Sequence, residues 1–259
     1  MHMYRLSLAK LFCALCISIL FSCKGRGCRH ESPPPIKYSE LVVPHVTTAI
    51  HCDGELDENE WFAAANSGPF IDLKTNQEAH PYSEARFLWD DQNLYITLYA
   101  ADDDIRTADA GHDGPLWLGD AFTLRFSVPS HDDEQYSLDV APNGIITDAK
   151  IFADKRVDTT WESHAIIGVD SDGTLNDPSD ADEEWVVEMA IPLRSLGLTG
   201  HPNESMKMKI SRCDTPKNSK RVCGAWGAIA GTSVLAGMLR LGSSISSTHA
   251  PASASAMGK

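Results

Sequence analysis

Short runs of large apolar residues, separated by polar turns, recur along most of the chain. Two of these runs, 87–89 and 94–99, are rich in β-branched and aromatic residues and flank the polar segment Asp90–Asn93. Such residues favour a half-buried pleated surface, whereas aspartate and asparagine favour tight turns. We therefore predict a β-hairpin here, with Asp90 and Asp91 as turn residues.

Eight further runs have the length and composition of β-strands, and turn sequences such as PNG at 142–144 separate most of them. They cover residues 121–128, 136–141, 145–152, 161–169, 185–192, 206–211, 226–230 and 238–241. Only the segment 56–65 stands out as helical. Many short strands with few helices predict an all-β fold, and we expect an antiparallel, jelly-roll-like β-sandwich with minor helical turns.

The first 22 residues differ from the rest of the chain. Arg5 and Lys10 precede the apolar run 11–21, which has the length of a signal-peptide core but is short for a membrane span. The run ends in Ser22-Cys23, and this resembles the bacterial lipoprotein signal, in which the cysteine is lipidated and becomes the new N-terminus. We expect a signal peptide over 1–22 and a lipid anchor at Cys23 that holds the protein to a membrane of the cell envelope. The alternatives are a secreted protein with an ordinary signal peptide and an uncleaved anchor.

Two segments flank the predicted sandwich. Residues 23–39 are basic and then proline-rich, which is typical of a tether. Residues 243–259 are rich in serine and alanine without periodicity, which is typical of a disordered tail. The sandwich is therefore expected to span residues 40–242 as one domain.

Charge restricts the class of partner. The chain has 259 residues and a formal net charge of −14. Removal of residues 1–22 would take away two of the 22 basic residues and none of the 36 acidic ones, so the charge would become −16. An excess of acidic residues argues against binding to nucleic acid.

Four cysteines lie outside the signal segment and the predicted lipidation site: Cys28, Cys52, Cys213 and Cys223. Cys213 and Cys223 flank a polar loop between two apolar segments, so we expect a disulfide between them in an oxidising compartment. No cysteine spacing in the sequence indicates a zinc site or a covalently attached haem.

Five motifs follow one another within the predicted domain. They are HCDGELDENEW at 51–61, FLWDDQNLYITLYAADDDI at 87–105, PLWLGDAFTLRF at 115–126, WVVEMAIPLRSLG at 185–197 and GMLRL at 237–241. In this order and spacing the chain resembles carbohydrate-binding module family 9 and its wider exported relatives. The resemblance implies a β-sandwich that binds a poly- or oligosaccharide without catalysing a reaction.

The resemblance also implies where a sugar would bind. In sugar-binding members the sugar lies between two tryptophans, because flat apolar sugar faces stack on aromatic rings. Trp117 falls on the first tryptophan, but 231–236 offers no aromatic residue where the second is expected. Thr123, Ser137 and Asp139 replace the family's glutamate, arginine and asparagine. Ser137 and Asp139 share one face of a strand, so we expect Trp117, Ser137 and Asp139 to contact carbohydrate. A core role for Trp117 is the alternative.

Acidic residues follow the second strand of the hairpin. The resemblance places Asp102 at an acid near the family's site and its metal ions, and Asp103 and Asp104 come directly after it. Calcium takes six to eight oxygen ligands, so we expect calcium, if it binds, to use Asp102 and Asp104. The alternative is a solvated acidic loop.

Two other functions have weaker support. Related sandwich domains hold a haem for electron transfer between axial side chains, and the chain offers Met189, Met206, Met208, His164 and His201 without specifying a pair. A glycoside hydrolase, or a protein associated with one, needs paired carboxylates in an aromatic cleft, and no such motif is present. We therefore expect a non-catalytic carbohydrate-binding protein that supports carbohydrate catabolism.

Overall fold

The computed structural model describes residues 39–127, 134–215, 219–230 and 233–244, all of which belong to one compact unit, Ile36–Lys259. The predicted signal peptide, Cys23 and nearly all of the predicted tether lie outside the described residues. Among the described residues, no helix is both long and apolar enough to cross a bilayer.

Strands dominate the described residues. They are β1 Glu40–His45, β2 Ala65–Asn66, β3 Ile71–Asp72, β4 Ser83–Trp89, β5 Asn93–Ala101, β6 Ala121–Ser127, β7 Gln135–Val140, β8 Ile146–Ile151, β9 Val157–Asp158, β10 Ile166–Asp172, β11 Glu184–Pro192, β12 Ser205–Asp214, β13 Val222–Trp226, β14 Ala228–Ala230, β15 Ser233–Leu235 and β16 Gly237–Ser244. Three short 3-10 helices accompany them: η1 Asn59–Ala63, η2 Leu116–Leu118 and η4 Leu193–Leu196. The helix η1 lies within the segment 56–65 that the sequence marks as helical.

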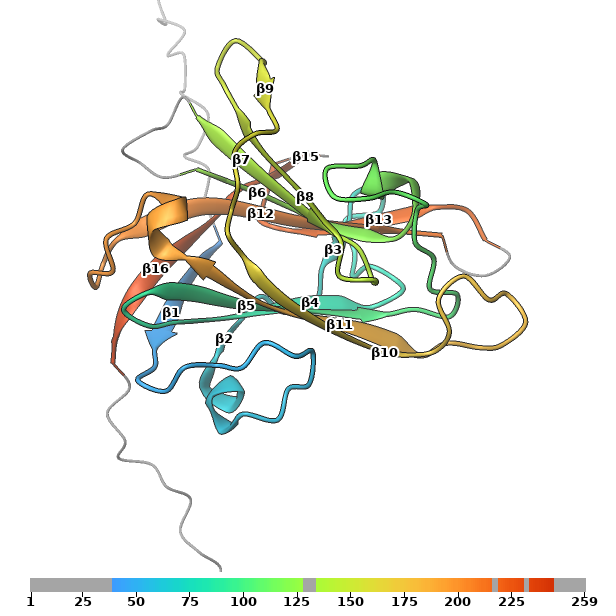
Figure 1. Cartoon of the computed structure of the whole chain (residues 1–259), viewed down its shortest axis with the longest axis horizontal. Coiled ribbons are helices and arrows are strands. Elements are labelled where there is room, and N and C mark those ends of the chain that lie inside the picture. Colours follow the sequence, from blue (N-terminus) through green and yellow to red (C-terminus); the bar gives the residue numbers. More distant parts are fainter. Residues whose placement is uncertain (1–38, 128–133, 216–218, 231–232, 245–259) are drawn as a thin grey trace, which may run out of the picture. The chain divides into compact units, whose positions relative to one another are not determined.

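The strands form two layers that pack face to face (Figure 1). The order of paired strands is β10-β11-β5-β4-β1-β16-β12-β6-β7-β8-β9, with β13 beside β12. Strands β10, β11, β5 and β4 belong to one layer and β12, β6, β7 and β8 to the other, with antiparallel pairing within each. Strand β1 connects the layers at one side, because it pairs in parallel with both β16 and β4. The predicted all-β sandwich is confirmed.

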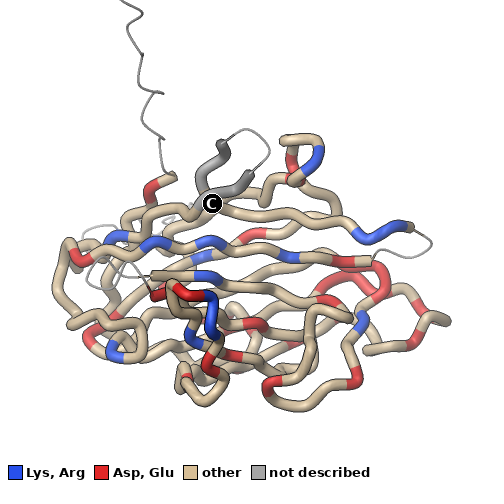
Figure 2. The backbone as a smooth tube through the Cα atoms, turned by 90° about the horizontal axis from the view of Figure 1, so that it is seen from above, with Lys and Arg blue, Asp and Glu red and all other residues tan. Residues whose placement is uncertain are grey.

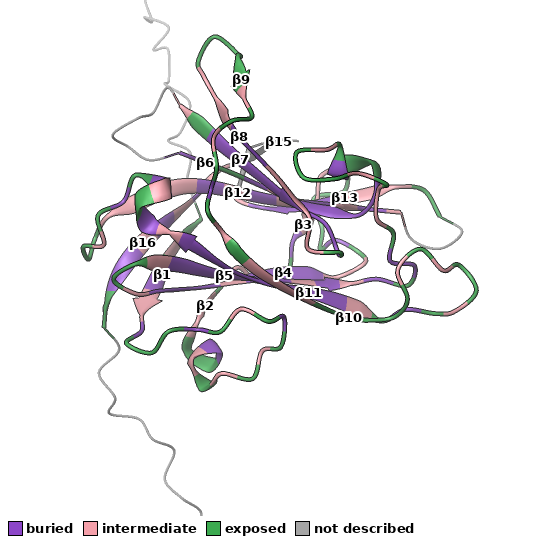
Figure 3. Cartoon of the chain, in the orientation of Figure 1, coloured by how far each residue is buried: buried purple, intermediate pink, exposed green. Residues whose placement is uncertain are grey.

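The hydrophobic core lies between the layers, where Figure 3 shows most strand positions as buried. Phe122 and Ile210 contribute to it from β6 and β12, and Leu98 and Trp185 contribute from β5 and β11; all four are fully buried. Burial of one such side chain stabilises the fold by about 1.5–3 kcal/mol. The period of two along β12 places alternate residues in this core and the others on the opposite face.

The predicted hairpin is β4–β5, and its turn uses aspartate as expected. Asp90 Oδ1 accepts the backbone N–H groups of Gln92 and Asn93 at 2.8 and 2.7 Å, and Asp90 Oδ2 accepts the hydroxyl of Tyr95 at 2.7 Å. The Asp90 side chain therefore closes the turn by accepting backbone N–H groups within it.

The outer side of the β4–β5–β11 layer is covered by the chain segment 46–65. Trp61 of this segment packs with Leu88 and Tyr95, and its Nε1 donates to Glu188 Oε1 at 2.8 Å. Glu188 also accepts the backbone N–H groups of Asp53 and Gly54, and burial raises its pKa to about 7. This layer is consequently closed on both sides.

Several predicted boundaries differ from the structure, and two of the differences have a clear local description. The run 161–169 forms a strand only from Ile166, because the N–H of Ser163 bonds to the Asp148 side chain and His164 has a left-handed φ of 56°. Neither feature is compatible with a continuous strand. The predicted tail begins too early, since β16 continues to Ser244, which pairs with His45.

Candidate functional site

The other layer, β12–β6–β7–β8, presents its outer side through two rows of side chains. One row contains Ser211, Thr123, Asp139 and Thr147, and the other contains Lys209, Arg125, Ser137 and Ala149. Each row runs across four neighbouring strands, whose alternate residues face the core. We call these two rows the outer face.

Trp117 lies at one end of the outer face, on η2. Thr147 donates its hydroxyl to the carbonyl of Gly114 at 2.7 Å, which fixes the loop before Trp117 to β8. Arg221 Nη2 donates to the carbonyls of Trp117 and Gly119, each at 3.0 Å. The Trp117 side chain itself is 57% exposed, so it is not a core residue and its ring is open to a ligand.

The predicted residues Ser137 and Asp139 occupy the outer face but lie below its surface, each with 6% exposure. Burial raises the pKa of Asp139, while the Thr123 hydroxyl and the charge of Arg125 lower it. Arg125 is exposed and Thr123 is partly exposed. A ligand on this face would therefore meet Thr123 and Arg125 before Ser137 and Asp139.

Basic residues interrupt the acidic surface on this side of the molecule. Figure 2 shows the chain from above, where Lys and Arg positions lie along the strands of the upper layer. Arg125 is exposed and Lys209 is partly exposed, both in the same row of the outer face. The outer face thus combines one exposed indole ring with hydrogen-bond donors of positive charge.

The disulfide expected from the sequence is present. Cys213 and Cys223 are directly opposite each other on β12 and β13 and are joined by a bond. This bond closes the loop that carries Arg221, which in turn contacts the loop of Trp117. The disulfide therefore supports one end of the outer face.

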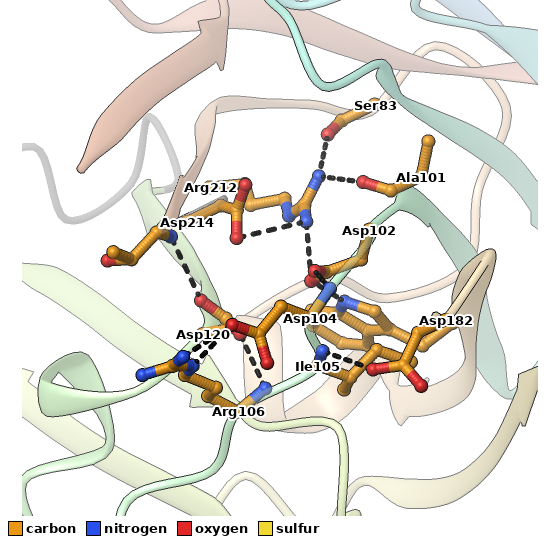
Figure 4. Close-up of polar contacts among 12 residues, drawn as sticks. Ser83, Ala101, Asp102, Asp104, Ile105, Arg106, Asp120, Asp182, Arg212 and Asp214 are labelled. Carbon is orange, nitrogen blue, oxygen red and sulfur yellow. Dashed lines mark hydrogen bonds and ion pairs between the residues drawn. The ribbon is translucent and has the colours of Figure 1, made fainter. Parts of the chain in front are cut away.

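Asp102 and Arg212 form a buried ion pair between the layers (Figure 4). Arg212 Nη2 lies 2.8 Å from Asp102 Oδ2, and Trp185 Nε1 donates to the same oxygen at 3.2 Å. Arg212 Nη1 donates to the carbonyl of Ala101 at 2.8 Å and to Ser83 Oγ at 3.2 Å. The charge of Asp102 is thus neutralised from within the protein.

Two further carboxylates, Asp120 and Asp214, meet Asp102 at this position. One oxygen from each of the three residues lies within 4.8 Å of the others, and all three are at least 97% buried. Burial is the main cause that raises the pKa of both Asp120 and Asp214, although Arg212 lowers it. We call Asp102, Asp120, Asp214 and Arg212 the arginine cluster.

Polar atoms of the arginine cluster remain without a hydrogen-bond partner in the protein, namely Arg212 Nε and both carboxylate oxygens of Asp214. Asp214 and Arg212 line a cavity of about 10 Å³. A cavity of this size has room for about one water molecule. The arginine cluster is therefore a buried polar network beside a cavity the size of one water molecule.

Asp104, the other predicted calcium ligand, faces a different partner. Its carboxylate accepts from Arg106 Nε at 2.9 Å, and its backbone N–H donates to Asp102 Oδ1 at 3.1 Å. Each of the two predicted ligands is paired with an arginine, and calcium binding by Asp102 and Asp104 stays a prediction. The three carboxylates that do converge are Asp102, Asp120 and Asp214.

Sequence reasoning did not identify Asp120, Arg212 or Asp214. The alternation along β12 contains the signal, since Arg212 and Asp214 continue the buried positions of Met208 and Ile210. A charged residue in register with core residues needs a buried partner of opposite charge. That partner, Asp102, could not be chosen among the many acids without the fold.

The methionines considered as haem ligands are core residues. Met189, Met206 and Met208 are at most 1% exposed and belong to the main hydrophobic cluster. His164 and His201 are exposed. The described residues therefore contain no methionine and histidine from this set that face one another across an open pocket.

Comparison with known proteins indicates a carbohydrate-binding family and the same fold. The family described as "Carbohydrate family 9 binding domain-like" matches residues 52–235. A search of curated proteins gave no match. Among solved structures, a presumed carbohydrate-binding protein from Bacteroides uniformis is similar with a TM-score of 0.61 and 14% identity, over 79% of this chain and 100% of that one.

A family 9 carbohydrate-binding module from Caldicellulosiruptor kristjanssonii is also similar, in two structures. Its complex with cellotriose has a TM-score of 0.55 and 16% identity, over 82% of this chain and 98% of that one. Its complex with glucose has a TM-score of 0.53 and 15% identity, over 82% and 100% of the two chains. At this level of identity the similarity shows the fold.

Proposed function

This chain belongs to the carbohydrate family 9 binding domain-like family, and we propose that it is a non-catalytic module that binds a poly- or oligosaccharide on its outer face. The main support is Trp117, whose large aromatic ring is 57% exposed at the end of a layer that is otherwise well packed. An exposed indole that the backbone holds in place costs little to order and suits stacking against a sugar ring. The family and the solved sugar complexes favour the same class of ligand.

The charge of the outer face suggests which saccharides to test first. Arg125 and Lys209 offer positively charged donors, whereas the chain as a whole is acidic. Charge-assisted hydrogen bonds to carboxylates are roughly twice as strong as neutral ones. We expect saccharides that contain uronic acids to bind more tightly than neutral ones, and a glycan array with both classes would rank them.

The substitution Trp117→Ala tests the proposed site. We expect affinity for the best array ligand to fall roughly tenfold to a hundredfold, since stacking on one aromatic ring contributes on the order of 1–3 kcal/mol. Stability should change little, because the side chain is exposed. Isothermal titration and thermal unfolding measure the two effects separately.

Phe62→Ala is the matched control, because Phe62 is 87% exposed on η1, in the segment that covers the opposite layer. It should leave binding unchanged. Equal losses in both variants, or no loss with Trp117→Ala, would show that sugar binds elsewhere. Unfolding of the Trp117→Ala variant would instead assign Trp117 to the scaffold.

We further propose that Cys23 carries a lipid that anchors the domain to a bacterial membrane. The support is the charged start, the short apolar run and Ser22-Cys23 in the sequence. In cells, Cys23→Ser should move the protein from the membrane fraction to the soluble fraction or block its processing. Labelling with a radioactive fatty acid gives the direct readout, and label that persists in Cys23→Ser would contradict the proposal.

A further inference from the structure

A second group of potential metal ligands lies away from the arginine cluster. His112 and Asp113 belong to the loop between β5 and β6, and Asp148 belongs to β8. One ligating atom from each of the three lies within 4.8 Å of the others. We call His112, Asp113 and Asp148 the histidine cluster.

Asp148 gives independent evidence of a ligand. Asp148 is completely buried, and its Oδ2 accepts the backbone N–H of Ser163 at 2.7 Å. Its Oδ1 is also buried and has no hydrogen-bond partner. A buried carboxylate with an unused oxygen costs several kcal/mol unless a positive partner reaches it.

The described residues supply no basic side chain other than histidine for this purpose. No arginine or lysine in the described ranges forms an ion pair with Asp113 or Asp148. His112 contacts two carboxylates: its Nδ1 lies 3.2 Å from Asp113 Oδ2, and its Nε2 lies 3.9 Å from Glu162 Oε2. With Asp148, one imidazole thus faces three carboxylates.

We propose that His112, Asp113 and Asp148 bind a divalent transition-metal ion, with Zn²⁺ as the representative. Imidazole nitrogen and carboxylate oxygen are both ligand types of zinc, and three protein ligands leave a fourth tetrahedral position for water. Calcium takes oxygen ligands and would not use His112. His112 and Asp113 have side chains 50% and 32% exposed, so the ion has access from solvent while Asp148 holds it from below.

The ion would connect segments that are distant in sequence. Asp113 lies four residues before Trp117. Its backbone N–H already donates to the carbonyl of Ile146 on β8 at 3.1 Å. Metal binding would add a further link between this loop and β8, beside this bond and that of Thr147 to Gly114. The consequence is a more rigid support for Trp117, although the metal site itself does not depend on the proposed function.

The test uses the full chain without a histidine tag, stripped with a chelator and then titrated with ZnCl₂, CoCl₂ or CaCl₂. We expect Zn²⁺ to raise Tm by several degrees, because an ion that binds only the folded state stabilises it. Co²⁺ should give visible absorption bands of a nitrogen- and oxygen-coordinated ion. Ca²⁺ should give neither effect.

His112→Ala should abolish the cobalt bands and weaken zinc binding roughly tenfold to a hundredfold. His51→Ala is the matched control, because His51 Nδ1 also lies 3.0 Å from an aspartate, Asp53, without a third buried carboxylate. It should leave both signals intact. A Tm that does not respond to Zn²⁺, or equal losses in the two variants, would overturn the proposal.

Asp148→Asn distinguishes the buried ligand from a surface chelate. If the variant folds, zinc affinity should fall as in His112→Ala. If it does not fold, His112→Ala decides the result. Unchanged zinc affinity in a folded Asp148→Asn variant would contradict the assignment of Asp148 as a ligand.

Discussion

The arginine cluster and the histidine cluster each bury carboxylates, but they satisfy them differently. Asp102 lies 2.8 Å from Arg212, whose charge is permanent and whose side chain is 3% exposed. Asp148 has only a backbone N–H on one oxygen and a half-exposed imidazole nearby. The chain itself neutralises Asp102, whereas we propose that an ion from solvent neutralises Asp148.

The two clusters differ because an arginine supplies the positive charge in one and a histidine is the only basic side chain in the other. Arginine remains protonated at all physiological pH values and supplies several donors from one side chain. Arg212 uses them on Asp102, Ser83 and the carbonyl of Ala101, which links β12 to the open end of the β4–β5 hairpin, opposite its turn. An imidazole carries at most one charge and loses it near neutral pH. A site built on it is therefore better suited to a metal than to a permanent ion pair.

The largest effect is expected from Arg212→Met. This change removes the buried counterion and leaves Asp102 uncompensated, which typically costs about 3–5 kcal/mol. Urea unfolding monitored by tryptophan fluorescence measures the loss. Addition of Asp102→Asn should recover part of it, because the uncompensated charge is then absent.

Arg106→Ala is the control for that experiment. Its partner Asp104 is buried, but the Arg106 side chain is 50% exposed, so solvent screens the pair. The expected cost is below about 1 kcal/mol. Equal costs for Arg106→Ala and Arg212→Met would mean that burial of the arginine does not distinguish the two ion pairs.

The sequence predicts the sandwich because its signals are local. The β4–β5 hairpin follows from two apolar runs and an aspartate turn, and β12 follows from strict alternation. The disulfide follows from two cysteines around a polar loop, which the structure places in a cross-strand pair. These features need only a few neighbouring residues to be recognised.

The site is less predictable because it depends on contacts between distant segments. The period of two correctly placed Ser137 and Asp139 on one face, but it could not show that their neighbours cover them. Asp102 and Asp104 are close in sequence and yet pair with different arginines. Asp148 meets His112 only because the β5–β6 loop returns to β8.

A smaller and pH-dependent effect is expected from Asp214→Asn. Burial raises the folded-state pKa of Asp214 above its unfolded value near 4, so the folded state binds the proton more tightly. This stabilisation is complete below about pH 4 and is lost as the pH rises through the folded-state pKa. Asparagine carries no charge at any of these pH values.

The variant should therefore be more stable than the native protein at about pH 8.5, on the order of 1 kcal/mol or more, and the gain should shrink towards about pH 5. Urea unfolding across this range gives the comparison. Asp57→Asn is the control, because Asp57 is exposed. A constant difference across the pH range would show that Asp214 is charged in the folded state throughout.

The smallest effect is expected from His112→Ala in the metal-free protein, and this result sharpens the comparison most. If the histidine cluster waits for an external ion, His112 is not the counterion of Asp148, and its loss should change the unfolding free energy by less than about 0.5 kcal/mol, as for an ordinary surface substitution. If His112 instead neutralises Asp148 as Arg212 neutralises Asp102, its removal should cost well above 1 kcal/mol in the presence of a chelator, because a buried charge would then lose its partner. Urea unfolding at about pH 7 with chelator separates these cases, and a large loss would make the two clusters equivalent and remove the need for a metal.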